Sequence, residues 1–284
     1  MLEKAPASDF DARFREIVSD PLNLLIRRVP SAGGIEDNCV VLHNGLRVPL
    51  DGAGAYYDSF SRILQINRGV HEPLEEFVFQ SVLQVMPQAP VMLELGAYWG
   101  HYSMWMAQQR PAAVLHLVEP EPENLEAGRA NFRRNGFSGT FLQALVGAQA
   151  FGVDRYLAET GIERLDVLHS DIQGAEAVML EGAEQSLARR TIDRVFVSTH
   201  SGPLHLECEE RLRSAGYVIE VSSDFDTHTT SFDGFIMASS PMVPTVFTPR
   251  PTILGRQEIA TLEPDDVLRA LAKISQSLRV SGDD

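Results

Sequence analysis

Two glycines and a glutamate interrupt an apolar stretch at residues 91–107, VMLELGAYWGHYSMWMA. Glu94, Gly96 and Gly100 lie where a predicted strand passes into a predicted helix. Glycine lets a backbone turn sharply or lets a ligand approach it closely. A strand, a glycine loop and a helix can together bind the nucleotide part of a cofactor. The spacing therefore predicts a nucleotide-cofactor site.

A second carboxylate, Glu119, ends the next apolar stretch, HLVEP. At the end of the second strand of a parallel sheet, a carboxylate can accept hydrogen bonds from ribose hydroxyls. Both NAD and S-adenosylmethionine contain this ribose. The G-x-x-x-G spacing differs from the NAD fingerprint G-x-G-x-x-G. Glu94 would repel a pyrophosphate but suits a cationic amino acid tail, which favours S-adenosylmethionine over NAD.

Asp171 and His200 are the candidate catalytic residues, because each ends a predicted apolar strand. An unperturbed histidine titrates near neutral pH, so His200 is predicted to act as a general base or a metal ligand. The alternative is a histidine that only orders the following loop. Asp171 could contact the cofactor amino group, orient His200 or bind a divalent ion. Glu176 is interpreted as a structural residue of the first helical turn.

His169 lies two residues before Asp171 and therefore on the same face of the predicted strand. His169, Asp171 and His200 could form a mixed nitrogen and oxygen metal site. No tight ligand spacing supports such a site. A buried, hydrogen-bonded His169 is the favoured interpretation, and the metal remains unknown.

From residue 91 onward, apolar strand patterns alternate with helical patterns. The predicted strands are VMLEL, AVLHLVEP, TFLQALVG, LDVLHSDIQG and RVFVSTH; helices follow as HYSMWMAQQR, EPENLEAGRANFRRNG, AEAVMLEGAEQSLARR and HLECEERLRSAGY. This alternation predicts an α/β fold with a parallel sheet and helices on both faces. The last two strands, YVIEVSS and FDGFIMASS, are joined by a short loop, so they should be antiparallel.

Three regions are expected along the chain. Residues 1–66 should form a cap with a helix that stops near Pro21 and a hairpin around His43-Asn44-Gly45, since Asn-Gly favours a tight turn. Residues 67–240 should form the cofactor-binding domain, entered by a helix that begins at Pro73. Residues 241–284 should be a linker and one helix, at about 264–278.

Composition narrows the range of partners. The chain has 284 residues, 44% of them hydrophobic, with a formal net charge of −15. Such acidity disfavours nucleic acid and anionic membranes, because nonspecific nucleic-acid binding depends on Lys and Arg. No secretory h-region and no apolar stretch of about 18 residues is found. Cys39 and Cys208 fit two reduced thiols, so a cytoplasmic protein is expected, and a homo-oligomer is left open.

Three motifs occur in order: ELGAYWGHYS, VEPEPENLEAGRANFRRNG and LDVLHSDIQGAEAVMLEGA. Together they resemble the FkbM-type S-adenosylmethionine-dependent methyltransferases, over about residues 67–237. The resemblance implies a class I methyltransferase (Rossmann-like) fold: a seven-stranded, mostly parallel sheet with a C-terminal antiparallel strand pair. It also implies methyl transfer, usually to oxygen.

The resemblance assigns roles to individual residues. Those expected around the methionine end of the cofactor are Glu94, Gly96, Ala97 and Gly100, with Ser103 at the helix start. Glu119 would hold the ribose, and Ala144 and Leu145 would lie beside the adenine. His71 and Glu72 would close over the cofactor, or alternatively cap a helix. The loop with Asp226, His228 and Asp233 would contact substrate or be solvated.

The chain departs from the family pattern at two places. Gln173 stands where the family usually has Glu, and Tyr98 and Trp99 stand in the glycine loop where it has an Asn. What the two aromatic residues select is open. The predicted function is methylation of a hydroxyl on a small molecule such as a sugar or polyketide. An NAD-dependent oxidoreductase and a catalytically silent binding module are the alternatives.

Overall fold

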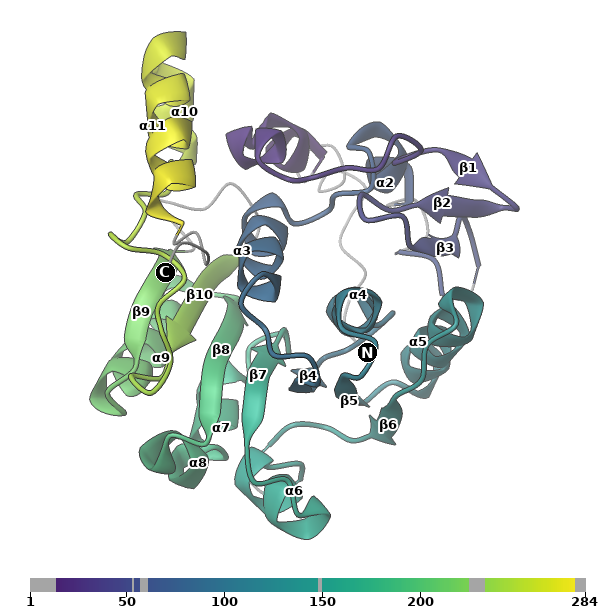
Figure 1. Cartoon of the computed structure of the whole chain (residues 1–284), viewed down its shortest axis with the longest axis vertical. Helices are drawn as coiled ribbons and strands as arrows, with labels where there is room; N and C mark the ends of the chain where they lie inside the picture. Colours follow the sequence, from purple (N-terminus) through teal and green to yellow (C-terminus); the bar gives the residue numbers. More distant parts are fainter. Residues whose placement is uncertain (1–13, 53, 57–60, 148–149, 225–232, 279–284) are drawn as a thin grey trace.

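The computed structural model describes residues 14–52, 54–56, 61–147, 150–224 and 233–278 (Figure 1). Its centre is a seven-stranded sheet in the order β6-β5-β4-β7-β8-β10-β9. The strands are β4 (Val91–Leu95), β5 (Val114–Glu119), β6 (Thr140–Gln143), β7 (Leu165–Ser170), β8 (Ile192–Thr199), β9 (Val218–Ser223) and β10 (Gly234–Ser239). Strands β4 to β8 pair in parallel, whereas β10 lies antiparallel between β8 and β9. The class I methyltransferase sheet expected from the sequence is confirmed.

Helices cover both faces of this sheet, as Figure 1 shows. On one side are α3 (Pro73–Leu83), α4 (His101–Gln109) and α5 (Pro122–Asn135); on the other are α6 (Val153–Thr160), α7 (Glu176–Glu181), α8 (Glu184–Arg189) and α9 (Gly202–Ser214). Successive side chains of a strand point to opposite faces. Met92 of β4 accordingly packs in the first core, and its neighbour Leu93 packs in the second.

The N-terminal segment packs onto the first of these cores. It contains helical residues 14–19, the 3-10 helix η1 (Pro21–Leu24), strands β1 (Ile35–Glu36), β2 (Cys39–Val41) and β3 (Arg47–Pro49), and α2 (Ser61–Ile66). The predicted hairpin is confirmed as β2 and β3, with β1 added at its edge. Val40 and Val48 of the hairpin share a core with Phe77 of α3 and Met92 of the sheet. The cap is therefore fixed to the sheet by apolar packing.

Three expectations for the second half of the domain were wrong. The helix predicted over AEAVMLEGAEQSLARR is two helices, α7 and α8, interrupted at Gly182 and Ala183. Helix α6 was not anticipated, and β6 ends at Gln143 rather than continuing to residue 147. The Asp154 backbone N–H donates to the Gly182 carbonyl at 2.8 Å, and the Asp154 carboxylate accepts from the Gln185 N–H at 2.8 Å. Contacts from α6 therefore stabilise the interruption.

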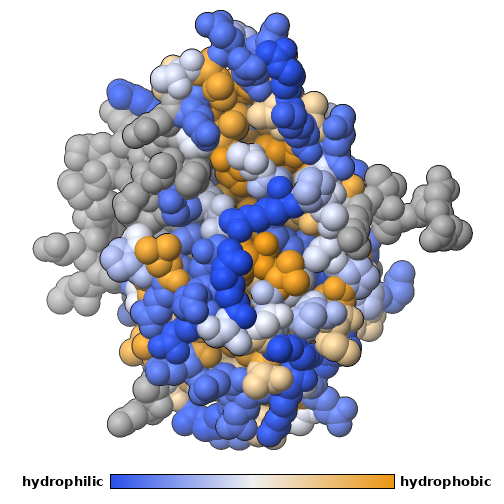
Figure 2. Space-filling model, turned by 90° about the vertical axis from the view of Figure 1, so that its left-hand side faces the viewer, coloured by the Kyte–Doolittle hydropathy of each residue, from blue (hydrophilic) through white to orange (hydrophobic). Residues whose placement is uncertain are grey.

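The C-terminal segment adds α10 (Arg256–Thr261) and α11 (Pro264–Ser277), the second of which matches the predicted helix. Leu271 and Ile274 of α11 join the first core. Figure 2 shows apolar side chains exposed near the C-terminal helices, where Leu268 is 59% exposed. None of the helices in the described ranges is both long enough and apolar enough to cross a membrane.

Candidate active site

The predicted catalytic residues and most of the predicted cofactor residues come from segments at the carboxyl edge of the sheet. In the strand register Leu95 pairs with both Val118 and Ser170, and Ser170 pairs with Val197. The segments that follow β4, β5, β7 and β8 therefore start side by side, at the edge where open α/β sheets bind ligands.

Gly96 is required by the neighbouring strand. Its φ is +74°, and a Cβ at this position would lie 1.8 Å from the Asp171 carbonyl oxygen. The N–H groups of Gly96 and Ala97 both donate to the Val118 carbonyl, at 2.9 and 3.0 Å. Gly100 also has a positive φ, +77°, and its Cβ would lie 2.9 Å from the Phe132 ring. Backbone and helix packing thus fix the shape of the glycine loop.

Glu94 lies beneath this loop. It is buried, and its Oε2 accepts from the Ser103 backbone N–H at 3.0 Å. Burial raises the pKa of Glu94. The Glu94 side chain therefore accepts at the first turn of α4, where unpaired N–H groups carry partial positive charge. In the described structure Glu94 and Ser103 support the helix that follows the loop.

Glu119 joins the glycine loop to α5. Its Oε2 accepts from the Tyr98 N–H at 3.0 Å, and its Oε1 accepts from the Glu121 N–H at 3.1 Å and from Asn124 Nδ2 at 3.3 Å. Burial raises the pKa of this carboxyl group. Tyr98 has a φ of +41°, a region that non-glycine residues seldom adopt. Its hydroxyl donates to the Ala55 carbonyl at 3.0 Å, so Tyr98 connects Glu119 to the cap.

Ala144 and Leu145 follow β6 at the same edge. Ala144 is half-buried against the second core, whereas Leu145 is 65% exposed. Strand β6 lies next to β5, which ends at Glu119, so the exposed Leu145 side chain can contact an apolar ligand surface near Glu119. Their predicted position next to an adenine is compatible with this exposure.

His200 is surrounded by carboxylates. Its Nδ1 lies 2.7 Å from Glu176 Oε1, and its Nε2 lies 3.2 Å from Asp171 Oδ1 and 3.5 Å from Asp233 Oδ1. The two predicted catalytic residues are therefore brought together. Glu176 was assigned only a helical role from the sequence, yet its side chain is buried against His200. Its position five residues after Asp171, at the start of α7, was the available signal, but spacing alone could not reveal the contact.

These contacts change the protonation of His200. Burial alone would lower its pKa, but hydrogen bonds with Asp171 and Glu176 and the charges of Asp171 and Asp233 outweigh burial and raise the pKa to about 11. Burial likewise favours a neutral Asp171, but His200 lowers the pKa of that carboxyl group. The sequence-based argument for a general base assumed an ordinary histidine pKa. With a pKa of about 11, His200 is an imidazolium at neutral pH and has no free lone pair.

This ion pair predicts how stability depends on pH. Because the pKa of His200 is raised in the folded state, His200 stabilises the fold fully below its unfolded pKa of about 6.5. This stabilisation is lost as pH rises through about 11. The lowered pKa of Asp171 stabilises the fold above the unfolded aspartate pKa of about 3.9, and this stabilisation decreases as pH falls below that value. We expect the unfolding free energy, measured by urea denaturation, to fall more steeply between pH 7 and pH 10 in the parent than in His200→Gln. Parallel curves for the two proteins would contradict the ion pair.

Several other predicted residues lie in the interior. His169 Nε2 is 2.5 Å from Glu75 Oε1, so the favoured interpretation of a buried, hydrogen-bonded histidine is confirmed. His71 is buried with Nδ1 2.7 Å from Glu76 Oε1, and Glu72 Oε2 accepts from the Tyr102 hydroxyl at 2.8 Å. The predicted closure of His71 and Glu72 over a cofactor stays a prediction. Asp226 and His228 lie outside the described residues.

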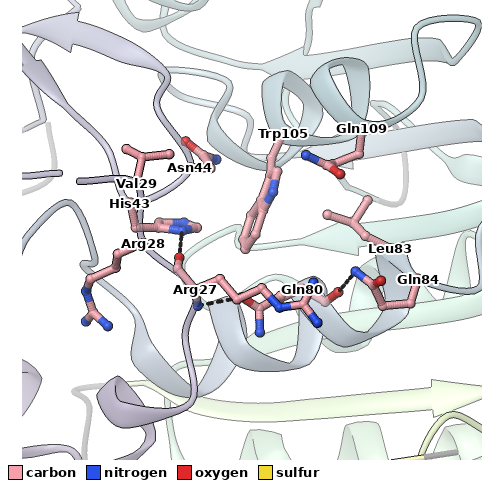
Figure 3. Close-up of a pocket in the computed structure, with 10 residues that line it drawn as sticks. All are labelled: Arg27, Arg28, Val29, His43, Asn44, Gln80, Leu83, Gln84, Trp105 and Gln109. Atoms are coloured by element: carbon pink, nitrogen blue, oxygen red, sulfur yellow. Dashed lines mark hydrogen bonds between the residues drawn. The ribbon is translucent and has the colours of Figure 1, made fainter. Parts of the chain in front are cut away.

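A cavity of about 250 Å³ lies away from this edge, between the cap and helices α3 and α4 (Figure 3). None of the predicted cofactor or catalytic residues lines it. Its lining residues are Arg27, Arg28, Val29, His43, Asn44, Gln80, Leu83, Gln84, Trp105 and Gln109. We assign the candidate active site to the carboxyl edge, where the chemically equipped side chains converge.

One family model matches part of the chain. Residues 146–219 match the family model described as the Methyltransferase FkbM domain. The matched segment includes Asp171, Glu176 and His200, and it confirms the resemblance in the third motif. A search of curated proteins gave no match.

Three methyltransferases are among the solved structures that the chain matches. The methyltransferase FkbM of Methylobacillus flagellatus is 16% identical, with 55% of this chain and 45% of that chain covered and a TM-score of 0.44. The precorrin-6y C5,15-methyltransferase of Geobacter metallireducens is 16% identical, with 57% and 84% covered and a TM-score of 0.42. The METTL16 methyltransferase domain is 13% identical, with 59% and 66% covered and a TM-score of 0.46.

Proposed function

We propose that this class I methyltransferase uses S-adenosylmethionine to methylate a hydroxyl oxygen of a small molecule. The carrying observation is the sheet itself, in which β10 lies antiparallel between β8 and β9 and the predicted site residues lie at one edge. In this proposal residues 67–240 bind the cofactor, residues 1–66 form a cap, and residues 241–284 form a linker and helix. The net charge of −15 favours a small acceptor, such as a sugar or polyketide, over a nucleic acid.

The glycine loop argues against NAD. A dinucleotide pyrophosphate binds the free N–H groups at a helix N-terminus. At the start of α4 the Glu94 carboxylate already accepts the Ser103 N–H at 3.0 Å. A pyrophosphate at this position would find the Ser103 N–H already hydrogen-bonded and would be repelled by the Glu94 carboxylate.

The residues at the edge fit S-adenosylmethionine. A carboxylate offers about four acceptor positions, and Glu119 accepts hydrogen bonds from Tyr98, Glu121 and Asn124, so capacity for a ribose hydroxyl remains. Asp171, Glu176 and Asp233 carry more negative charge than one imidazolium neutralises, which suits a cationic ligand. When bound, S-adenosylmethionine supplies a methyl group on a positively charged sulphur.

The chain's own residues would handle the hydroxyl proton. The Asp171 side chain is 31% exposed, so an acceptor can reach the pair that it forms with His200. Glu176 holds the Nδ1 side of the imidazole and leaves Nε2 directed toward Asp171. His200 can accept a proton at Nε2 only after its pKa falls from about 11, and a cation bound beside Asp171 shifts the pKa in that direction. Magnesium on the Asp171 and Asp233 oxygens is the alternative.

Glu119→Ala is expected to weaken cofactor binding at least tenfold. The reason is that hydrogen bonds to a charged acceptor are each worth roughly 1.5–3 kcal/mol. Calorimetric titration with S-adenosylhomocysteine measures this loss, and circular dichroism checks the fold. Asn124→Ala is the matched control, because it removes one donor to Glu119 and keeps the carboxylate.

An unchanged dissociation constant in Glu119→Ala would refute the ribose assignment. If the parent binds NAD and no S-adenosylhomocysteine, the proposed class is wrong. A catalytically silent binding module would bind S-adenosylhomocysteine yet transfer no labelled methyl group to any acceptor in a small-molecule extract. Recovery of a labelled product from that extract would also identify the acceptor atom.

A further inference from the structure

A second cluster of ionisable side chains is buried between the cap and the sheet domain. His43 comes from the turn of the β2–β3 hairpin, Glu76 from α3, and His101 is the first residue of α4. The side chains of His43 and Glu76 are 0% exposed, and His101 is 2% exposed. The candidate active site uses none of the three.

His101 is not satisfied by its surroundings. Both ring nitrogens are buried, and neither has a hydrogen-bond partner among the described residues. Its ring stacks on Trp99 at a centroid distance of 5.1 Å, a contact that leaves the nitrogens unpaired. Buried polar atoms in folded proteins nearly always have a partner, because an unpaired one costs free energy. His101 therefore has a buried ring nitrogen available to a ligand.

The three side chains converge on one point. His43 Nε2 lies 3.0 Å from Glu76 Oε2, and one ligand atom from each of the three residues lies within 4.8 Å of the others. Tetrahedral zinc with bonds of about 2.0–2.2 Å separates its ligands by roughly 3.3 Å. Small side-chain rotations would bring the three atoms to that separation.

Neighbouring groups orient the ligand atoms. His43 Nδ1 lies 3.4 Å from the Arg27 carbonyl oxygen (Figure 3), and since a carbonyl only accepts, Nδ1 is the donor. The other ring nitrogen, Nε2, lies beside Glu76 Oε2. Glu76 Oε1 accepts from the backbone N–H groups of His71 and Glu72 at 2.8 and 3.0 Å, which leaves Oε2 for the cluster. Histidine ligands of metals are commonly held by such a hydrogen bond at the second ring nitrogen.

We propose that His43, Glu76 and His101 bind one divalent transition-metal ion, for which zinc is the best match. Imidazole nitrogen favours zinc over magnesium or calcium, which prefer all-oxygen ligands. The ion would join the hairpin of the cap to α3 and α4. His43 is the member of this cluster that lines the cavity of about 250 Å³, together with Trp105 (Figure 3).

Zinc titration of the full chain tests the site. After dialysis against a chelator, calorimetry with Zn²⁺ alone is expected to give one equivalent, and cobalt(II) should give the intense visible bands of tetrahedral coordination. Saturating zinc should raise the Tm by roughly 5 °C, because the ion binds only the folded state. The double variant His43→Gln, His101→Gln should bind at least about a hundredfold more weakly, since even losses around a ligand cost 10–100-fold.

His116→Gln is the matched control, because His116 is also buried but is bonded to the Tyr156 hydroxyl at 2.7 Å. It should bind zinc like the parent. The proposal is overturned if the parent takes up no zinc, or if the double variant takes up as much as the parent. It is also overturned if Asp171→Asn, at the sheet edge, abolishes the uptake instead. The parent measurements decide the question even if the double variant does not fold.

Discussion

His200→Gln is expected to lower methyl-transfer turnover by about 10²–10⁴-fold, while affinity for S-adenosylhomocysteine changes little. This is the range typical of removing a group that accepts a proton in the transition state. Glutamine is uncharged and cannot replace the ion pairs that join His200 to Asp171, Glu176 and Asp233. Single-turnover kinetics with labelled cofactor separate the chemical step from binding. His116→Gln controls for the loss of a buried histidine distant from the sheet edge.

The pH profile distinguishes the roles open to His200. If it accepts the proton, the parent rate rises through the pKa that His200 has in the cofactor complex, and that limb is absent in His200→Gln. If Asp171 and Asp233 instead bind magnesium beside His200, a chelator abolishes activity and added magnesium or manganese restores it. Normal turnover of His200→Gln together with no chelator effect would rule out both roles. Catalysis would then rest on proximity and orientation of the acceptor.

Gly96→Ala is expected to destabilise the fold by about 3 kcal/mol or more and to abolish cofactor binding. A residue with a Cβ pays roughly 1–3 kcal/mol for a left-handed backbone conformation. At Gly96 the added Cβ would also lie 1.8 Å from the Asp171 carbonyl oxygen, so β4 and β7 would have to separate at the site. Urea denaturation measures the stability, and titration with S-adenosylhomocysteine measures the binding.

Gly136→Ala provides the matched control for this substitution. Gly136 ends α5 with a φ of +77°, close to the +74° of Gly96, but a Cβ there meets no atom within 4 Å. Gly136→Ala therefore has only the conformational cost, without a steric clash, so its loss of stability should be clearly smaller than that of Gly96→Ala. Equal losses in the two variants would show that the close approach to Asp171 is unimportant.

The glycine loop illustrates how a sequence can give the right residues for an incomplete reason. Gly96 and Gly100 were predicted from their spacing between a strand and a helix, as positions where a cofactor approaches the backbone. In the fold their first requirement comes from the Asp171 carbonyl and the Phe132 ring. Both neighbours lie far along the chain, and the sequence contains no local sign of them.

The sequence by itself determined the features that depend on periodicity and local backbone chemistry. Alternating strand and helix patterns predicted the mostly parallel sheet, Asn44-Gly45 predicted the hairpin, and the short loop after β9 predicted its antiparallel partner. Each depends on residues close together in the chain. The same patterns also predicted that Asp171 and His200 share an edge, since parallel strands align their carboxyl ends.

Only the tertiary structure decided the chemistry of these groups. The pKa of His200 is raised by carboxylates 24 to 33 positions away in the chain. Glu176 was recognised as part of the site only because its carboxylate lies 2.7 Å from the His200 ring. His43, Glu76 and His101 converge from a hairpin and two helices that share no motif. Charge interactions and ligand geometry depend on distances in space and on burial, which are fixed only when the cap packs against the sheet.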